Sequence, residues 1–267
     1  MRKYTLLTSV LLTAPFSAGN VSAQCVATQD CASLGYTENS CENGGIKCPF
    51  GNTWACKGNS DTSIENPENG RDNPDCTYGA IYYSDGTCIK EFVLGRIPIG
   101  VVVYMDTVDN QKWIMALDDA TSGVKWSTEY VDVPNLTNYQ TKETAVNDVK
   151  SCENTEAMLA LGELRYPAAA VAKNYVPIVA RHTKGKWCLP AAGIWNMVNN
   201  HREEIDAAIS RASGTSLGSS DYYWSSSEYS SYDAWAWNSS GAFTNGYKGG
   251  SYASNDKFPY VRPVMKI

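Results

Sequence analysis

The sequence has few of the groups that commonly carry catalysis or bind nucleic acid. Only two histidines, His182 and His201, occur in 267 residues, which leaves little for a histidine-rich metal site or a relay of histidine bases. Charged residues make up 19% of the chain, and 28 acidic residues outnumber 22 basic ones. The chain therefore lacks the basic excess that nucleic-acid binding requires. After residue 23 no apolar run approaches the roughly 20 residues that span a bilayer, so we expect no transmembrane segment and no nucleic-acid partner.

Motifs of common catalytic and metal sites are also missing. No G-x-S-x-G nucleophile elbow occurs. The adjacent carboxylates Asp118-Asp119 and Glu203-Glu204 point apart on a strand or helix, which indicates solvated faces rather than an acid–base pair. Cys188 follows His182 closely, so a Cys–His nucleophile is one interpretation, but Cys152 offers a disulfide partner. We expect no catalytic residue, no metal site and no cofactor.

The N-terminus has the pattern of an export signal. Arg2 and Lys3 precede an uncharged, mostly apolar stretch, and Val21-Ser22-Ala23 places small residues where a signal peptidase reads. We predict a signal peptide over residues 1–23, cleaved after Ala23, and a secreted or cell-surface protein. The nine cysteines agree, because disulfides persist outside the cytosol.

Residues 24–75 are predicted to be a cysteine-rich segment and linker. Glycine, asparagine, serine and aspartate dominate, so the segment cannot bury a core of its own and needs cross-links. The cysteine spacings do not match C-x2-C, which favours disulfides over zinc. Their pairing and the odd member stay open for Cys25, Cys31, Cys41, Cys48 and Cys56.

Residues 76–267 have the pattern of an α+β domain. Asp85-Gly86 predicts a hairpin turn that sets Cys76 opposite Cys88. Apolar runs predict strands over 98–104, 112–117 and 260–265, whereas helical spacing predicts helices over 154–161 and 191–212 with a break at Asn199-Asn200. The strands at both ends are expected to share one sheet, and a Cys152–Cys188 bridge is expected across the helical region.

The segment 219–256 combines many aromatic residues with serine, asparagine and glycine. Ten large rings cannot all be buried in so short a stretch, and tyrosine with small polar residues is typical of antibody-like binding surfaces. A tyrosine-rich sheet surface without a ligand, or a weakly ordered loop, is the alternative. The rings belong to Tyr222, Tyr223, Trp224, Tyr229, Tyr232, Trp235, Trp237, Phe243, Tyr247 and Tyr252.

Several motifs resemble a known domain family. Trp187-Cys188-Leu189-Pro190-Ala191-Ala192-Gly193, Tyr223-Trp224-Ser225-Ser226-Ser227-Glu228, Ala234-Trp235 and Tyr260-Val261-Arg262-Pro263-Val264 occur in this order. Together they resemble the Lcl-type C-terminal domain, which is related in fold to C-type lectins and to the formylglycine-generating enzyme. The resemblance covers about 76–267 and implies a C-type-lectin-like fold. Its members include the variable ligand-binding proteins of diversity-generating retroelements.

The resemblance also assigns roles to residues. The scaffold would comprise Trp224, Ser225, Ser226, Glu228, Trp235, Val261, Arg262 and Pro263. The variable, ligand-binding stretch would comprise Tyr229, Ser230, Ser231, Tyr232 and Asp233, with Ala236, Asn238, Ser240, Asn245, Tyr247, Tyr252, Ser254 and Asn255 as further members. The lectin motifs Glu-Pro-Asn and Trp-Asn-Asp are missing, so calcium-dependent sugar binding is not expected. No cysteine follows Cys188, so formylglycine-generating activity is not expected either.

The sequence therefore predicts a secreted, non-catalytic binding protein. Its ligand would be a protein or glycan on another cell or phage surface. Two alternatives remain: an exported enzyme of the formylglycine-generating or Cys-dependent type, and a surface adhesin or pilus-tip subunit attached through its cysteine-rich segment. The ligand, the oligomeric state and the action of a retroelement stay open.

Overall fold

The computed structural model describes residues 38–39, 56–57, 73–106, 111–218, 222–250 and 257–267. The chain divides into a first unit, 1–62, and a second unit, 63–267, called here the C-terminal unit. In the first unit, β1 (Glu38–Asn39) pairs antiparallel with β2 (Cys56–Lys57). The predicted signal peptide and the other residues of the cysteine-rich segment up to position 72 lie outside the described residues.

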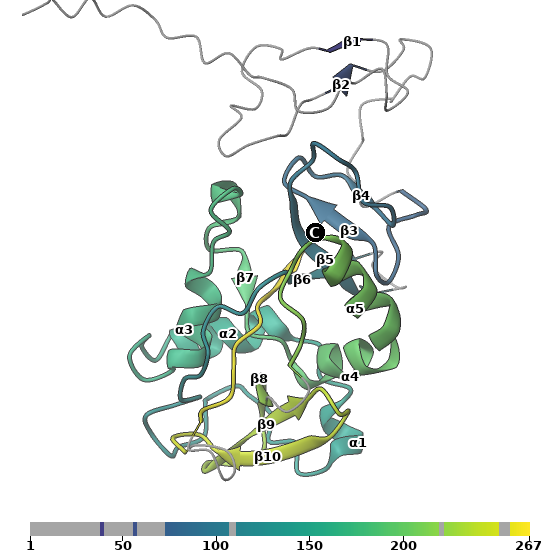
Figure 1. Cartoon of the computed structure of the whole chain (residues 1–267). Coiled ribbons are helices and arrows are strands. Elements are labelled where there is room, and N and C mark those ends of the chain that lie inside the picture. Colours follow the sequence, from purple (N-terminus) through teal and green to yellow (C-terminus); the bar gives the residue numbers. More distant parts are fainter. Residues whose placement is uncertain (1–37, 40–55, 58–72, 107–110, 219–221, 251–256) are drawn as a thin grey trace, which may run out of the picture. The chain divides into compact units, whose positions relative to one another are not determined.

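A six-stranded antiparallel sheet forms one half of the C-terminal unit (Figure 1). Val101, Val102 and Val103 of its central strand are fully buried, because β-branched residues pack well on a pleated surface. The last strand of the chain lies between two earlier ones, so both ends of the unit share one sheet, as the sequence predicts. The order is β4 (Cys88–Ile89), β3 (Ile81–Tyr83), β5 (Pro98–Asp106), β6 (Gln111–Ala116), β11 (Val264–Lys266) and β7 (Trp187–Cys188).

Two consecutive helices cover one face of this sheet. The helices α4 (Ala192–Asn200) and α5 (Arg202–Arg211) both pack on β5. Their buried residues recur at helical spacing and join the side chains of the sheet in one core. The predicted break at Asn199-Asn200 lies one residue too early, because both asparagines complete α4 and His201 separates the helices.

Further helices build a second core beside the first. The helix α2 (Ser151–Leu159) begins before the predicted start, and α3 (Pro167–Asn174) and the short α1 (Lys142–Ala145) are not predicted by the sequence pattern. A proline at the first position of α3 replaces an amide that would have no partner there. Small alanine side chains of α3 pack against Trp126 and Tyr166 in this core.

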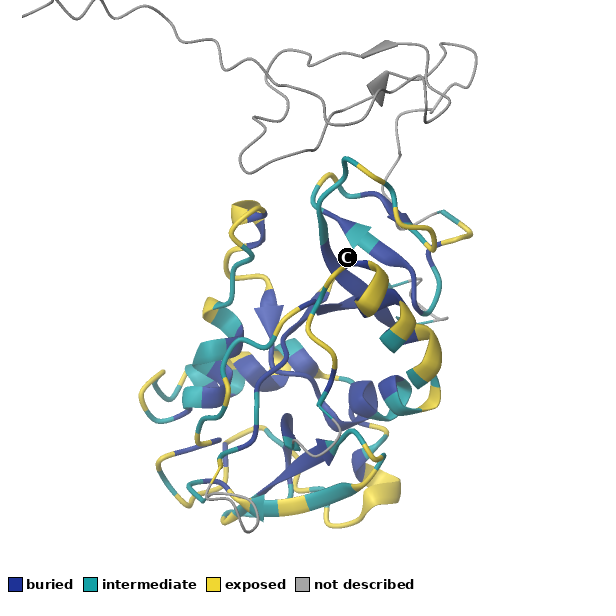
Figure 2. Cartoon of the chain, in the orientation of Figure 1, coloured by how far each residue is buried: buried dark blue, intermediate teal, exposed yellow. Residues whose placement is uncertain are grey.

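A smaller, three-stranded antiparallel sheet holds the aromatic segment (Figure 1). Its order is β10 (Phe243–Tyr247), β9 (Asp233–Asn238) and β8 (Tyr222–Glu228). Trp237 of β9 stacks on Trp195 of α4 with 4.8 Å between ring centroids. Figure 2 shows β8 and β9 largely buried, whereas β10 is mostly half-buried or exposed.

Two disulfides join these elements, and both pairings are those predicted. Cys76–Cys88 ties the chain before β3 to β4, with 5.1 Å between Cα atoms, and Cys152–Cys188 ties α2 to β7, with 5.0 Å. Sequence separations of 12 and 36 residues mean that each bridge restricts the unfolded chain. Within the described ranges no helix is both long and apolar enough to cross a membrane. The fold class is α+β.

Candidate functional site

The strand β8 forms the rigid base of the aromatic segment. Its register against β9 shifts between Trp224 and Glu228, where three serines bond to other elements instead. The Ser226 amide donates to the Pro190 carbonyl at 2.7 Å, and the Ser227 hydroxyl accepts from the Ala192 amide at 2.9 Å. The residues expected to be scaffold are indeed buried: Trp224, Ser225, Ser226, Glu228, Trp235, Val261, Arg262 and Pro263.

A buried carboxylate organises the serines. Asp148 is 2% exposed. Its Oδ2 accepts from the Ser227 hydroxyl at 2.6 Å and from the side-chain amide of Asn154 at 2.8 Å. These partners lie on β8 and α2, so one side chain joins both elements. Sequence reasoning missed Asp148, because its partners are distant in the chain.

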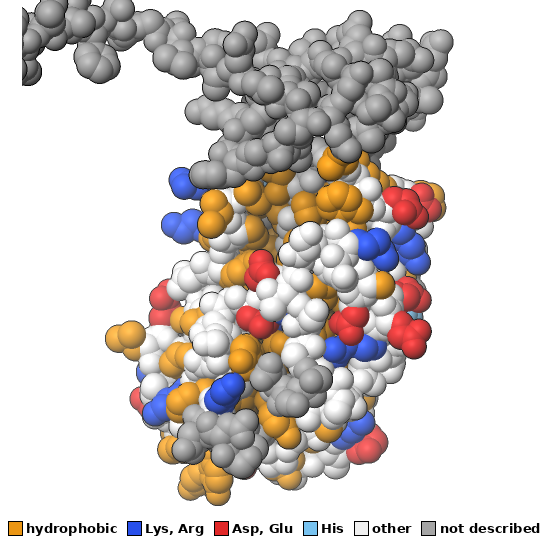
Figure 3. All heavy atoms as spheres, in the orientation of Figure 1, with side chains coloured by type: hydrophobic (Ala, Val, Ile, Leu, Met, Phe, Trp, Pro, Cys, Tyr) orange, Lys and Arg blue, Asp and Glu red, His pale blue; other side chains and the backbone are white. Residues whose placement is uncertain are grey.

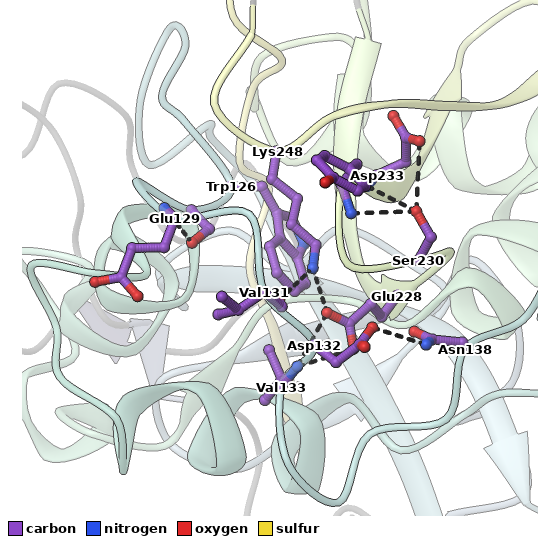
Figure 4. Close-up of polar contacts among 12 residues, drawn as sticks. Trp126, Glu129, Val131, Asp132, Val133, Asn138, Glu228, Ser230, Asp233 and Lys248 are labelled. Carbon is purple, nitrogen blue, oxygen red and sulfur yellow. Dashed lines mark hydrogen bonds and ion pairs between the residues drawn. The ribbon is translucent and has the colours of Figure 1, made fainter.

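A fully buried ion pair joins the end of β8 to the residue after β10 (Figure 4). The carboxylate of Glu228 pairs with the ammonium of Lys248, and neither side chain has any solvent exposure. Both oxygens of Glu228 accept from the Val133 amide, at 3.1 and 3.2 Å, and Lys248 Nζ donates to the Val131 carbonyl at 2.8 Å. The ammonium also lies 4.9 Å from the centre of the Trp126 ring. Burial raises the pKa of Glu228 and lowers the pKa of Lys248, whereas their pairing opposes both shifts.

This ion pair positions a surface loop against the sheet. Because it bonds Val131 and Val133, it holds the neighbouring Tyr130 beside the turn before β9. There the ring of Tyr130 stacks on Tyr232, with 6.1 Å between centroids and 26° between planes. The two side chains are 47% and 59% exposed. They form an aromatic pair that faces solvent on a fixed support, called here the tyrosine pair.

Local hydrogen bonds shape the turn that carries Tyr232. The amides of Tyr229 and Ser230 donate to the Asp233 carbonyl at 3.0 and 3.1 Å, and the Ser230 hydroxyl accepts from the amides of Tyr232 and Asp233 at 3.2 Å. Ser231 completes the turn and is half-buried. The predicted stretch 229–233 is therefore a preformed turn with Tyr232 as its most exposed side chain.

Two further predicted residues lie on β10 near this turn. Asn245 and Tyr247 are exposed, and Tyr247 is directly opposite Asp233. Because successive side chains of a strand alternate, Tyr247 and Lys248 point to opposite faces of the sheet. Figure 3 shows hydrophobic side chains, among which tyrosine is counted, at the margin where Figure 1 places β10.

Packing limits the exposure of two other residues of the predicted site. Ala236 has no solvent exposure, so it cannot touch a ligand while the sheet is intact. Tyr229 is half-buried and packs edge-on against Trp235 at 5.5 Å, which gives it a packing role. Four of the ten rings counted in the segment form core instead of surface, because β8 and β9 are covered on both faces: Tyr223, Trp224, Trp235 and Trp237.

Two predicted contact residues stabilise a distant turn. Asn238 and Ser240 lie at the other end of the β9–β10 hairpin, about 17 Å from the tyrosine pair at the usual rise of a strand. The side-chain oxygen of Asn238 accepts from the amides of Ser240 and Ala242, both at 3.1 Å. The structure therefore does not bring them together with Tyr232. The predicted Tyr252, Ser254 and Asn255 lie outside the described residues.

Cys188, the nucleophile of the Cys-dependent alternative, lies in a disulfide. Cys188 is 1% exposed and its sulfur is bonded to Cys152, so it is not the free thiolate that a Cys-dependent mechanism requires. Among the described residues, no three His, Cys, Asp or Glu side chains gather to hold a metal ion. A pocket of about 360 Å³ lies between β5 and the segment 175–179, and no predicted site residue lines it.

Comparison with known proteins finds a structural neighbour. No protein-family model and no curated protein match the chain. A solved structure described as a fimbrial protein from Bacteroides ovatus is similar, with a TM-score of 0.51 and 16% sequence identity. The similarity covers 72% of this chain and 49% of that protein, so this chain spans about half of the neighbour's length. At this identity the likeness concerns the fold.

Proposed function

We propose that the protein is an exported, non-catalytic binding protein whose tyrosine pair contacts a protein or glycan on another surface. The observation that carries this proposal is the exposure of Tyr130 and Tyr232 above a buried, fully bonded support. Solvent-facing aromatic side chains on a rigid base supply contact area at low entropic cost.

The buried Glu228–Lys248 pair supports the proposal. A tyrosine that is held by a mobile loop loses conformational freedom when it binds, and that loss weakens affinity. Here the loop that carries Tyr130 is bonded through Val131 and Val133 to the ion pair. The loop that carries Tyr130 therefore loses much of its conformational freedom during folding, before any ligand binds.

The same proposal includes the C-type-lectin-like fold and the relationship to retroelement-diversified proteins. Supporting it are the buried motif Trp224-Ser225-Ser226-Ser227-Glu228 and the exposed Tyr232 in the turn 229–233 that follows it. Sequencing the gene and its surroundings tests the diversified branch: an adjacent reverse transcriptase gene and a near-copy of the codons for 229–233 are expected.

A second candidate is a surface adhesin or fimbrial subunit. The likeness to the fimbrial protein from Bacteroides ovatus favours it, as do the two disulfides, which are compatible with an extracytoplasmic location. In an adhesin the tyrosine pair would have the same binding role, with the segment 24–75 as the attachment part. Deleting 24–75 should then abolish surface display and preserve ligand binding.

The binding proposal is tested on printed arrays of cell-surface glycans and of purified cell-surface proteins. The labelled protein from residue 24 onwards should bind discrete spots, and Tyr130→Ala and Tyr232→Ala should each weaken binding at least tenfold. Ile178→Ala is the matched control, because Ile178 is an exposed apolar side chain outside the predicted site. Equal binding by all three variants, or no bound spot, would refute the proposal.

A further inference from the structure

The strand β10 forms one edge of the three-stranded sheet. In the described part of the chain, β10 ends the three-stranded sheet and pairs only with β9. Figure 1 shows the strand at the margin of the C-terminal unit. An unpaired strand edge presents backbone donors and acceptors to any strand that can approach it.

The register shows which backbone groups face outward. The Asn238 amide donates to the Ala242 carbonyl at 2.9 Å, and the Lys248 amide donates to the Tyr232 carbonyl at 3.0 Å. Hydrogen-bonded pairs alternate with non-bonded pairs in an antiparallel ladder. The amides of Phe243, Asn245 and Tyr247 therefore point away from β9.

Some of the outward carbonyls already have partners. The Tyr247 carbonyl accepts from the Gly250 amide at 3.0 Å. The Asn245 carbonyl accepts from the Thr244 hydroxyl at 3.2 Å, which leaves one of its two lone pairs. Counting contacts among the described residues alone, the edge retains donors at three positions and acceptor capacity at Phe243 and Asn245.

The other sheet edges in the described residues are shorter or covered. The edge strands β4 and β7 have two residues each, and each carries a disulfide. The edge of β8 is bridged by Asn138 and Tyr260. By contrast, β10 has five residues, FTNGY, without a charge or a proline, although charge and proline are the usual protection of an edge.

We propose that β10 pairs antiparallel with β10 of a second copy, about a two-fold axis at Asn245. The three outward residues are symmetric about Asn245, so one strand can serve as its own partner in an isologous interface. Two Asn245–Asn245 bonds and two bonds from Tyr247 amides to Phe243 carbonyls would join the copies. The two sheets would become one of six strands.

Side chains across the axis are complementary in this register. Phe243 lies opposite Tyr247 of the second copy, and aromatic cross-strand pairs stabilise sheets. The Lys142 ammonium lies 5.3 Å from the centre of the Phe243 ring, and Asp233 is directly opposite Tyr247 within each copy. The axis therefore brings Lys142 of each copy towards Asp233 of the other, two strand spacings away.

The proposed ladder between the copies uses no residue of the tyrosine pair. Tyr130 and Tyr232 contact each other beside β9, and their rings are not part of the proposed contact. A dimer would carry two such pairs on one continuous sheet. Two linked sites raise the avidity for a repetitive surface without any new contact.

Sedimentation equilibrium on the protein from residue 24 onwards tests the pairing. Free thiols are alkylated first, so that intermolecular disulfides do not contribute. The wild type should reach twice its monomer mass below 100 μM. Asn245→Asp should raise the dimer dissociation constant at least tenfold at pH 7.5, because like charges then meet at the axis, and Asn245→Ser is the neutral control. Asn245→Pro, which removes an outward amide, should also weaken the dimer at least tenfold.

Each result decides the proposal. A wild type that stays monomeric at 100 μM overturns it, as does a dimer that neither Asn245→Asp nor Asn245→Pro weakens. If circular dichroism shows that Asn245→Pro does not fold, the comparison of Asn245→Asp with Asn245→Ser decides alone. Array binding by Tyr130 and Tyr232 is measured separately, so failure of the dimer leaves the proposed function in place.

Discussion

Glu228 at the end of β8 and Lys248 just after β10 form an ion pair from which water is excluded on all sides. Each charge depends on the other, because a single buried charge without a partner costs several kcal/mol. The pair therefore couples the stability of the sheet to the position of the loop at Tyr130.

Removing one member of this pair should strongly destabilise the protein. Lys248→Met leaves the Glu228 carboxylate buried alone, and we expect a loss of about 3–5 kcal/mol in the free energy of unfolding. Glu228→Gln combined with Lys248→Met should cost less than the sum of the two single changes, because no unpaired charge remains. Urea unfolding measures all three variants.

The exposed pair Arg165–Glu129 gives the matched control. Both of its side chains are about 40% exposed, so Glu129→Gln should change stability by less than about 1 kcal/mol. If Glu129→Gln and Lys248→Met lowered the free energy of unfolding by similar amounts, burial would not determine the cost of breaking an ion pair.

Alkaline pH should weaken the fold through Tyr223. Burial raises the pKa of Tyr223 to about 12 from the ordinary value of 10.0. Between these values the folded state keeps a proton that the unfolded chain loses, so this stabilisation is complete below pH 10 and lost as pH rises through about 12. The expected loss is about 3 kcal/mol.

Tyr223→Phe isolates this effect. At neutral pH the variant should be about 1 kcal/mol less stable, because it lacks the hydroxyl that accepts from the Gly218 amide at 3.2 Å. Above pH 11 the difference should shrink or reverse. A constant difference in the free energy of unfolding from pH 7 to 12 would contradict this prediction.

Free-thiol labelling should leave four cysteines unmodified. In denaturant without reductant, alkylation followed by peptide mass analysis should find Cys76–Cys88 and Cys152–Cys188 as linked peptides. The chain has nine cysteines, so an odd number remains and at least one is labelled or joins two chains. An alkylated Cys188 in the native protein would favour the Cys-dependent enzyme.

Arg262 should be intolerant even of lysine. Its guanidinium is fully buried and donates to Asp119 Oδ1 at 2.6 Å, to the Leu117 carbonyl at 2.5 Å and to the Thr215 carbonyl at 2.8 Å. Lysine cannot reproduce this planar set of donors, so Arg262→Lys should cost more than about 2 kcal/mol. Arg96→Lys at the more exposed Arg96–Asp85 pair is the control and should have little effect in the same urea titration.

Local patterns were enough to predict much of the fold. The Asp85-Gly86 turn, the valine-rich strand around 101–103 and the helical spacing near Ile205 depend only on neighbours in sequence. The helix α3 was missed, because an alanine-rich stretch has little amphipathic pattern and owes its position to tertiary packing.

The site was harder to predict for the same reason. Tyr232 could be proposed from composition and from the resemblance, but Tyr130 lies far from it in sequence and meets it only in the folded state. Ala236 was assigned to the surface, although packing on both faces of β9 buries it. Burial on two faces is a property of the assembled sheet and has no signature within the strand itself.

The position of β11 has a consequence for the order of folding. Residues 264–266 form hydrogen bonds with β6 on one side and β7 on the other, so β7 joins the large sheet only once β11 has paired with β6. Long-range pairing of this kind delays folding. Assembly of the large sheet is therefore expected to finish at β11, which links β7 to the other four strands.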